Sequence, residues 1–119
     1  MSAPSFELAE ALEQAGDPQL LRELVEVLLD EGAKKFALIL SAEADGDARS
    51  LEAVAHALKG AVVVFGAKSM GATFEDLEQT ARAGMIVECR PLVRRAESEW
   101  SALVNDLETW LASVRKDAP

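Results

Sequence analysis

Apolar side chains recur every three or four positions along most of the chain, which is the period of an amphipathic helix. Turn residues divide this pattern into one short segment and four longer ones. The expected helices are a leading helix over about 5–14 and longer helices over about 17–44, 47–65, 69–83 and 90–115. Short connections make consecutive helices antiparallel neighbours. The sequence therefore predicts one all-α domain over residues 1–119, an antiparallel up-down-up-down four-helix bundle with a short extra N-terminal helix.

Capping and turn residues mark the ends of these helices. The expected N-caps are Ser5, Asp17, Asp47 and Ser69, and the prolines expected in first helical turns are Pro18 and Pro91. Gly32 lies inside the second helix and predicts a weak spot or slight bend, because the apolar pattern resumes after it. The stretch Val62-Val63-Val64 would suit a strand, but a lone strand would have no partner in this sequence, so we expect it to be helical.

The third predicted helix carries the single histidine of the chain. Its core-facing stripe should consist of Leu51, Ala55, Leu58, Val62 and Phe65. His56 lies about 140° from the centre of that stripe at 3.6 residues per turn, so its imidazole should be exposed. Gly60, one turn later, costs a helix about 0.5–1 kcal/mol relative to alanine. That cost is explained if the glycine lets another molecule approach His56 closely.

Composition and charge exclude several classes of function. The formal net charge of −9 disfavours a nucleic-acid partner. One cysteine and one histidine can form neither an internal disulfide nor the usual nitrogen- and sulfur-ligated metal site, so no metal is expected. No apolar run approaches about 18 residues and no signal-like segment opens the chain, so we expect a cytoplasmic protein without a membrane span. The sequence also contains no nucleotide motif or phosphate loop, which disfavours an enzyme with its own turnover.

The stretch His56-Ala57-Leu58-Lys59-Gly60, followed by Phe65-Gly66-Ala67, resembles the signature of histidine phosphotransfer (HPt) domains. In that family the histidine is phosphorylated, the lysine three residues later supports the phosphoryl group, and the glycine after it leaves room for a receiver domain. His56, Lys59, Gly60 and Gly66 match position by position. Val64 departs from the pattern, because the family often has an asparagine there.

The resemblance implies a phosphocarrier and not an enzyme. It implies that His56 relays a phosphoryl group between receiver-domain aspartates in a two-component phosphorelay, with Lys59 and Gly60 in support. The partners would be response-regulator receiver domains and a hybrid sensor kinase. The chain would need no cofactor, because the receiver supplies the aspartate and the bound Mg²⁺. The resemblance and the lack of a long exposed apolar stripe also favour a monomer.

The following helix offers a partner for the histidine. Glu75 and Glu78 lie off its apolar stripe, and in an antiparallel arrangement one of them could hydrogen-bond the far ring nitrogen of His56. Glu78 is the candidate, because the phosphotransfer domain of chemotaxis kinases is similar in having a glutamate there. The alternative is two solvated acids on a helix face. Lys59 could likewise be an ordinary lysine paired with Glu52 or Glu75.

Small apolar residues around the histidine predict a docking surface. The expected members are Ala53, Ala57, Val63 and Ala67. Two other functions remain open on the sequence alone. One is a scaffold or inhibitor of the same fold that binds a kinase or receiver without carrying phosphate. The other is a phosphoacceptor domain of a chemotaxis-type kinase.

Overall fold

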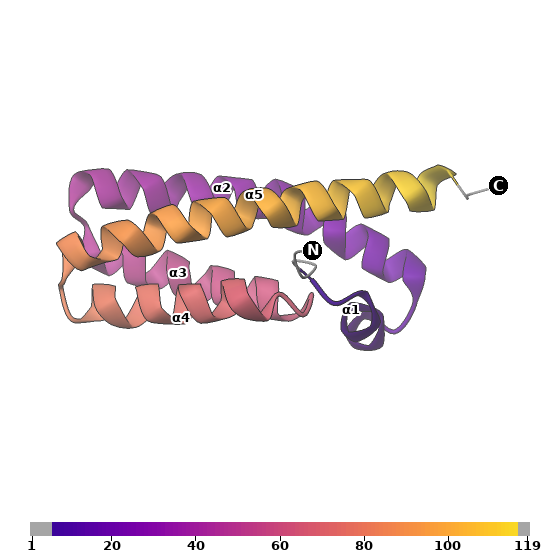
Figure 1. Cartoon of the computed structure of the whole chain (residues 1–119), viewed down its shortest axis with the longest axis horizontal. Coiled ribbons are helices and arrows are strands. Elements are labelled where there is room, and N and C mark those ends of the chain that lie inside the picture. The colour runs from indigo at the N-terminus through magenta and orange to yellow at the C-terminus, as the bar shows by residue number, and fades with distance from the viewer. Residues whose placement is uncertain (1–5, 117–119) are drawn as a thin grey trace.

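The computed structural model of the chain describes residues 6–116, and these residues form helices joined by short turns, with no strand among them. The helices are α1 (Leu8–Ala15), α2 (Pro18–Asp45), α3 (Ala48–Val63), α4 (Lys68–Arg82) and α5 (Ile86–Lys116). From α2 to α5 the chain runs alternately in opposite directions, and the four helices lie side by side (Figure 1). The predicted all-α, up-down-up-down bundle with a short leading helix is therefore confirmed.

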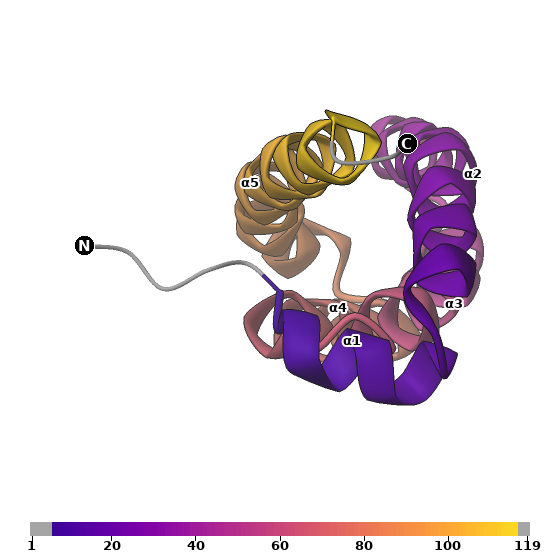
Figure 2. The same cartoon turned by 90° about the vertical axis from the view of Figure 1, so that its right-hand side faces the viewer.

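The first helix lies across the end of the bundle, in front of the ends of α3 and α4 (Figure 2). The amide of Glu7 donates to the carbonyl of Phe65 over 3.1 Å, which ties the start of α1 to the turn after α3. Gly66 in that turn has a φ of +70°, and a Cβ there would lie 2.8 Å from Cβ of Glu7. Glycine is therefore required at this position both by backbone conformation and by space.

Two of the expected N-caps are confirmed. Asp17 accepts a hydrogen bond from the Leu20 amide over 2.8 Å, and Asp47 accepts one from the Ser50 amide over 3.1 Å. The expectation for Ser69 is wrong. Helix α4 already begins at Lys68, and the Ser69 hydroxyl instead donates to Glu99 on α5 over 2.6 Å. Ser5 lies outside the described residues.

The prediction that Pro91 begins the last helix is also wrong. Helix α5 begins at Ile86, so Pro91 lies inside it and cannot donate to the carbonyl of Val87. The apolar stripe explains the earlier start, because Ile86 packs against the core, and Cys89 and Val93 are both fully buried. Burial of these side chains outweighs one missing backbone hydrogen bond at an exposed position.

The core confirms the predicted stripe of the histidine helix. Leu51, Ala55, Leu58, Val62 and Phe65 are all buried. Helix α3 continues through Val63, so two of the three valines are helical as expected, whereas Val64 is the C-cap and begins the turn. Among the side chains of α1 that the structure describes, Ala11 and Ala15 are buried, while Leu12 is only half-buried.

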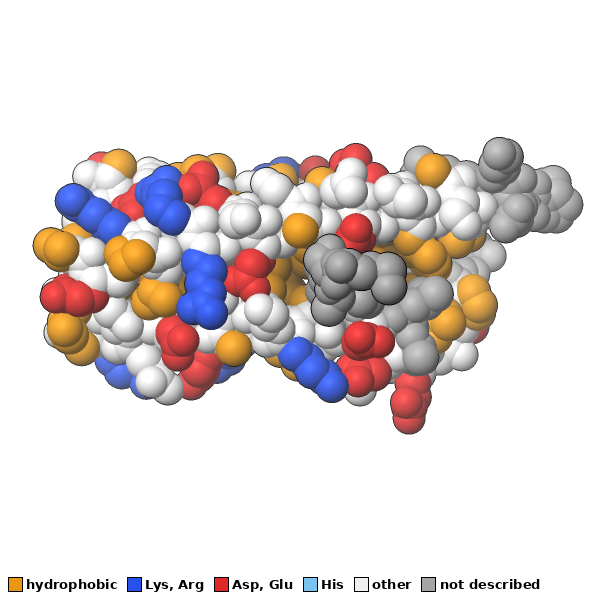
Figure 3. Space-filling view, viewed as in Figure 1, with side chains coloured by type: hydrophobic (Ala, Val, Ile, Leu, Met, Phe, Trp, Pro, Cys, Tyr) orange, Lys and Arg blue, Asp and Glu red, His pale blue; other side chains and the backbone are white. Residues whose placement is uncertain are grey.

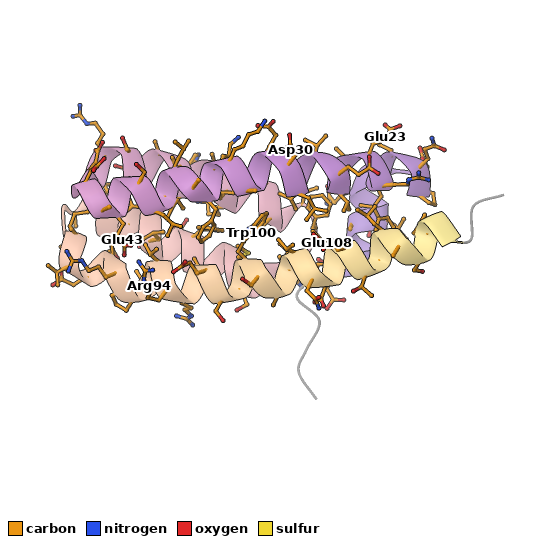
Figure 4. All side chains as sticks on the ribbon, turned by 90° about the horizontal axis from the view of Figure 1, so that it is seen from above. Glu23, Asp30, Glu43, Arg94, Trp100 and Glu108 are labelled. Carbon is orange, nitrogen blue, oxygen red and sulfur yellow. The ribbon has the colours of Figure 1, made fainter. Side chains whose placement is uncertain are left out.

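Gly32 has a packing role that the sequence pattern did not predict. It is buried in a continuous α2, and a Cβ there would lie 2.4 Å from Cη2 of Trp100. Figure 4 shows Trp100 reaching from α5 toward α2. Its ring stacks on Phe36, with centroids 6.1 Å apart and an interplanar angle of 11°. The glycine thus makes room for the tryptophan, which gives it a packing role.

The surface mixes charges of both signs. On the face of Figure 3, acidic and basic side chains alternate with small apolar areas, and the histidine is not visible. Within residues 6–116, no helix combines the length and apolar character that crossing a bilayer requires.

Candidate functional site

Helix α3 presents His56 to solvent. Its neighbours Ala55 and Leu58 are fully buried, so the helix is fixed with the imidazole outward, and the side chain is 68% exposed. One turn on, Gly60 is exposed, and a Cβ built there would meet nothing within 4 Å. The predicted exposure of His56 and the open space above Gly60 are both present in the structure.

Glu78 of α4 is the partner of the imidazole. Its side chain is only 7% exposed, and Oε2 lies 3.0 Å from Nδ1 of His56. The same carboxylate accepts from Nζ of Lys59 over 3.1 Å and from Nη2 of Arg82 over 2.9 Å. Glu78 is therefore a buried acid with three donors, and the alternative of a solvated glutamate is wrong for it.

These contacts determine which nitrogen of the ring is available. Burial alone would raise the pKa of Glu78, but hydrogen bonds from Lys59 and His56 outweigh it and hold the pKa below its ordinary value. An ionised carboxylate can only accept, so in the neutral imidazole this contact favours the tautomer in which Nδ1 carries the proton and Nε2 carries the lone pair. No hydrogen bond to Nε2 is formed by the part of the chain that the structure describes.

Lys59 points toward α4 and is held by two acids. Its Nζ donates to Oε2 of Glu75 over 2.5 Å as well as to Glu78. The hydrogen bond that Lys59 donates to Glu75 raises the pKa of Lys59 and lowers the pKa of Glu75. Of the two acids considered as partners of Lys59, Glu75 is the one that it binds. The alternative pairing with Glu52 is wrong, because Glu52 binds Arg82 over 2.8 Å.

Arg82 is a site residue that the sequence analysis missed. It lies one helical turn after Glu78, a spacing at which opposite charges on a helix pair, and this was the available signal. It joins Glu78 to Glu52 and lies on the rim of a hollow of about 460 Å³ beside the histidine. No group of three or more His, Cys, Asp or Glu within residues 6–116 is arranged to hold a metal ion.

Three of the four residues predicted for the docking surface are exposed. Ala53 and Ala57 are exposed, and Val63 is 55% exposed. The prediction that Ala67 lies on this surface is wrong, because the residue is only 1% exposed. It precedes the first residue of α4 and its amide donates to the carbonyl of Val62, which draws it into the core.

An apolar hollow between α2 and α3 was not predicted. It has a volume of about 340 Å³, and its lining includes Leu24, Val27, Ala61 and Val64. Val27 and Val64 are among the exposed large apolar side chains of the chain. The signal in the sequence was the apolar character of Val27 and Val64 on the outer sides of their helices.

Comparisons with known proteins bear on the family and the fold of the chain. The family model described as the Hpt domain matches residues 23–115. The crystal structure of histidine-containing phosphotransfer protein B from Pseudomonas aeruginosa PAO1 superimposes with a TM-score of 0.86, over 94% of this chain and 98% of that one. The two sequences are 21% identical, so this likeness concerns the fold. No curated protein sequence gave a significant match.

Proposed function

The chain belongs to the Hpt domain family, and from that premise we propose that it relays a phosphoryl group between the aspartates of receiver domains through His56. One observation carries the proposal. The imidazole is exposed, its Nδ1 is held by the buried carboxylate of Glu78, and its Nε2 faces away from that contact. This is the arrangement that a nucleophilic ring nitrogen requires.

The transfer follows from that arrangement. The lone pair of Nε2 attacks the phosphorus of an aspartyl phosphate, the Nε2–P bond forms, the P–O bond breaks, and the receiver's carboxylate leaves. The ring then carries a positive charge, because the proton on Nδ1 stays in place. That proton donates to Glu78, whose negative charge stabilises the new cation. The reverse sequence passes the group to the next aspartate, and no proton is released in either direction.

The neighbouring residues have supporting roles in this proposal. Lys59 supplies a positive charge close to the phosphoryl group, and Gly60 leaves room for the incoming receiver. Ala53, Ala57 and Val63 form the surface on which the receiver docks. The receiver contributes the aspartate and its Mg²⁺, and this chain contributes no metal.

The proposed partners are response-regulator receiver domains and a hybrid sensor kinase. The chain meets them as a cytoplasmic monomer. Its role is that of a carrier, because the described site offers a nucleophile and charges that stabilise the carried group.

Phosphoryl transfer from a labelled receiver tests the proposal directly. Wild type and His56→Gln are each mixed with a panel of receiver domains that carry a radiolabelled phosphoryl group. We expect acid-labile, base-stable label on the wild type and none on His56→Gln. Thermal unfolding of both proteins controls for the fold, which an exposed substitution should leave intact.

The opposite result has a definite meaning. If the folded wild type takes no label from any receiver and yet binds them, the chain is a scaffold or inhibitor of this fold. If it takes label only from a kinase domain with ATP, it is a phosphoacceptor domain of the chemotaxis type. Either result would overturn the relay between receiver aspartates.

A further inference from the structure

The ammonium of Lys59 is already engaged before any phosphoryl group arrives. It has three N–H donors, of which one reaches Glu75 over 2.5 Å and another reaches Glu78 over 3.1 Å. Both acids lie on α4, so the side chain leans across the α3–α4 contact and not toward open solvent. A phosphoryl group on His56 therefore meets a lysine whose charge is already balanced by carboxylates.

The two acids differ in what else they do. Glu78 is buried and also holds Nδ1 of His56, so it positions the ring. Glu75 is 40% exposed, and its other hydrogen bond comes from Gln79, one turn later on α4, over 2.7 Å. None of the hydrogen bonds described for Glu75 reaches the histidine. The hydrogen bonds of Glu75 therefore connect it to the site through Lys59.

We infer that Glu75 sets the transfer equilibrium by competing with the phosphoryl group of phosphorylated His56 for Lys59. The inference rests on the proposed function. It holds for either geometry of the phosphorylated state. If the phosphoryl oxygen takes the third N–H, two anions share one ammonium and repel each other. If the oxygen displaces Glu75, the contact between Glu75 and Lys59 is lost. In both cases the phosphohistidine is less stable than it would be without Glu75.

The functional consequence is that phosphorylated His56 gives up its phosphoryl group more readily. The covalent step remains the exchange of a P–O bond to aspartate for the Nε2–P bond, and Glu75 takes part in neither bond. It raises the free energy of the phosphorylated chain relative to the free chain, in which Glu75 and Lys59 are paired. A carrier needs this balance, because it must release the group to the next aspartate as readily as it accepts it.

The equilibrium constant between a receiver and the chain tests the inference. Labelled receiver is mixed with unlabelled chain, and labelled chain with unlabelled receiver, until both mixtures reach the same distribution. Glu75→Gln keeps the shape of the side chain and removes its charge. We expect it to shift the distribution toward phosphorylated His56 by about two- to fivefold, the range for partly exposed charge pairs.

Two controls separate this effect from a general change in charge. Asp76→Asn removes the same charge from the next residue of α4, which is exposed, and it should shift the equilibrium much less. In a Lys59→Met background, the effect of Glu75→Gln should fall to about that of Asp76→Asn, because the competition for Lys59 is gone and only longer-range charge repulsion remains. Thermal unfolding confirms that each variant is folded.

Each outcome is decisive. An equilibrium for Glu75→Gln that equals that of wild type or of Asp76→Asn overturns the inference, as does an undiminished effect in the Lys59→Met background. These results leave the relay itself intact. If the wild type takes no label at all, the proposed function fails, and this inference fails with it.

Discussion

Two glycines inside helices should respond oppositely to the same substitution. Gly32 lies under the ring of Trp100, whereas Gly60 lies beneath open space. Alanine in place of glycine gains about 0.5–1 kcal/mol in a helix when nothing else changes. Gly60→Ala should therefore stabilise the protein by about that amount. Gly32→Ala offers the same gain but adds a steric cost.

The cost at Gly32 follows from the distances. The new Cβ would lie 2.4 Å from Cη2 of Trp100 and 3.1 Å from two more ring atoms. Favourable carbon contacts lie at about 3.5–4.0 Å, so the ring must retreat by about 1 Å. Overpacking of this kind costs about 1–3 kcal/mol, including any loss of the stacking on Phe36. After the gain in helix propensity, Gly32→Ala should destabilise the protein by about 0.5–2 kcal/mol.

Urea unfolding followed by circular dichroism and tryptophan fluorescence measures both changes. The fluorescence of native Gly32→Ala should also differ from wild type, because the ring of Trp100 has moved. A Gly32→Ala protein as stable as wild type would show that the ring does not approach α2 as described. A destabilised Gly60→Ala would show that the space above His56 and Gly60 is not open.

Further predictions concern the acid, the turn and the proline. The folded pKa of Glu78 lies below its ordinary value of 4.5, so its contribution to stability is present above that value and is lost as pH falls through the folded pKa. Glu78→Gln should therefore flatten the fall in melting temperature below about pH 4.5. An unchanged slope would contradict the described network. Glu78→Gln should also slow phosphorylation of His56, measured with labelled receiver, since a neutral amide stabilises the ring cation less. Gly66→Ala should destabilise the fold by about 2 kcal/mol or more, through strain at positive φ and contact with Glu7; urea unfolding equal to wild type would be incompatible with this turn. Pro91→Ala restores the donor that the Val87 carbonyl lacks and should stabilise by about 1–3 kcal/mol in the same assay, whereas a loss of stability would mean that the proline favours the helix.

Helical periodicity was enough to predict the architecture and the exposed histidine. The stripe from Leu51 to Phe65 alone fixes which way His56 faces, because one helix has one buried side. Antiparallel packing then placed either Glu75 or Glu78 near the ring, and the resemblance to the phosphotransfer domain of chemotaxis kinases favoured Glu78, whose contact the structure gives. The architecture and the exposed histidine rest on local spacing and on the order of the helices, whereas the choice of Glu78 rests on that resemblance.

The errors come from contacts between distant parts of the chain. The position of Gly32 beneath Trp100 depends on the register of α2 against α5, which no local pattern gives. The burial of Ala67 depends on how the turn after α3 folds back into the core. The prediction that Pro91 begins the last helix relied on the local preference of proline for the first turn. Burial of Cys89 and Val93 is the larger effect, so the helix begins before the proline.

The docking of α1 has a consequence for how the chain opens. A helix of eight residues is too short to be stable alone in water, so α1 is helical because it packs against α2 and is tied to the turn between α3 and α4. Its undocking would expose Ala11 and Ala15 and break the hydrogen bond from Glu7 to Phe65 while leaving the longer helices folded, which is a partial opening and not global unfolding. Amide protons of α1 should therefore exchange with solvent well before those of α3, and equal rates would mean that the five helices open together. Each opening would briefly enlarge the apolar surface at the end of the histidine helix.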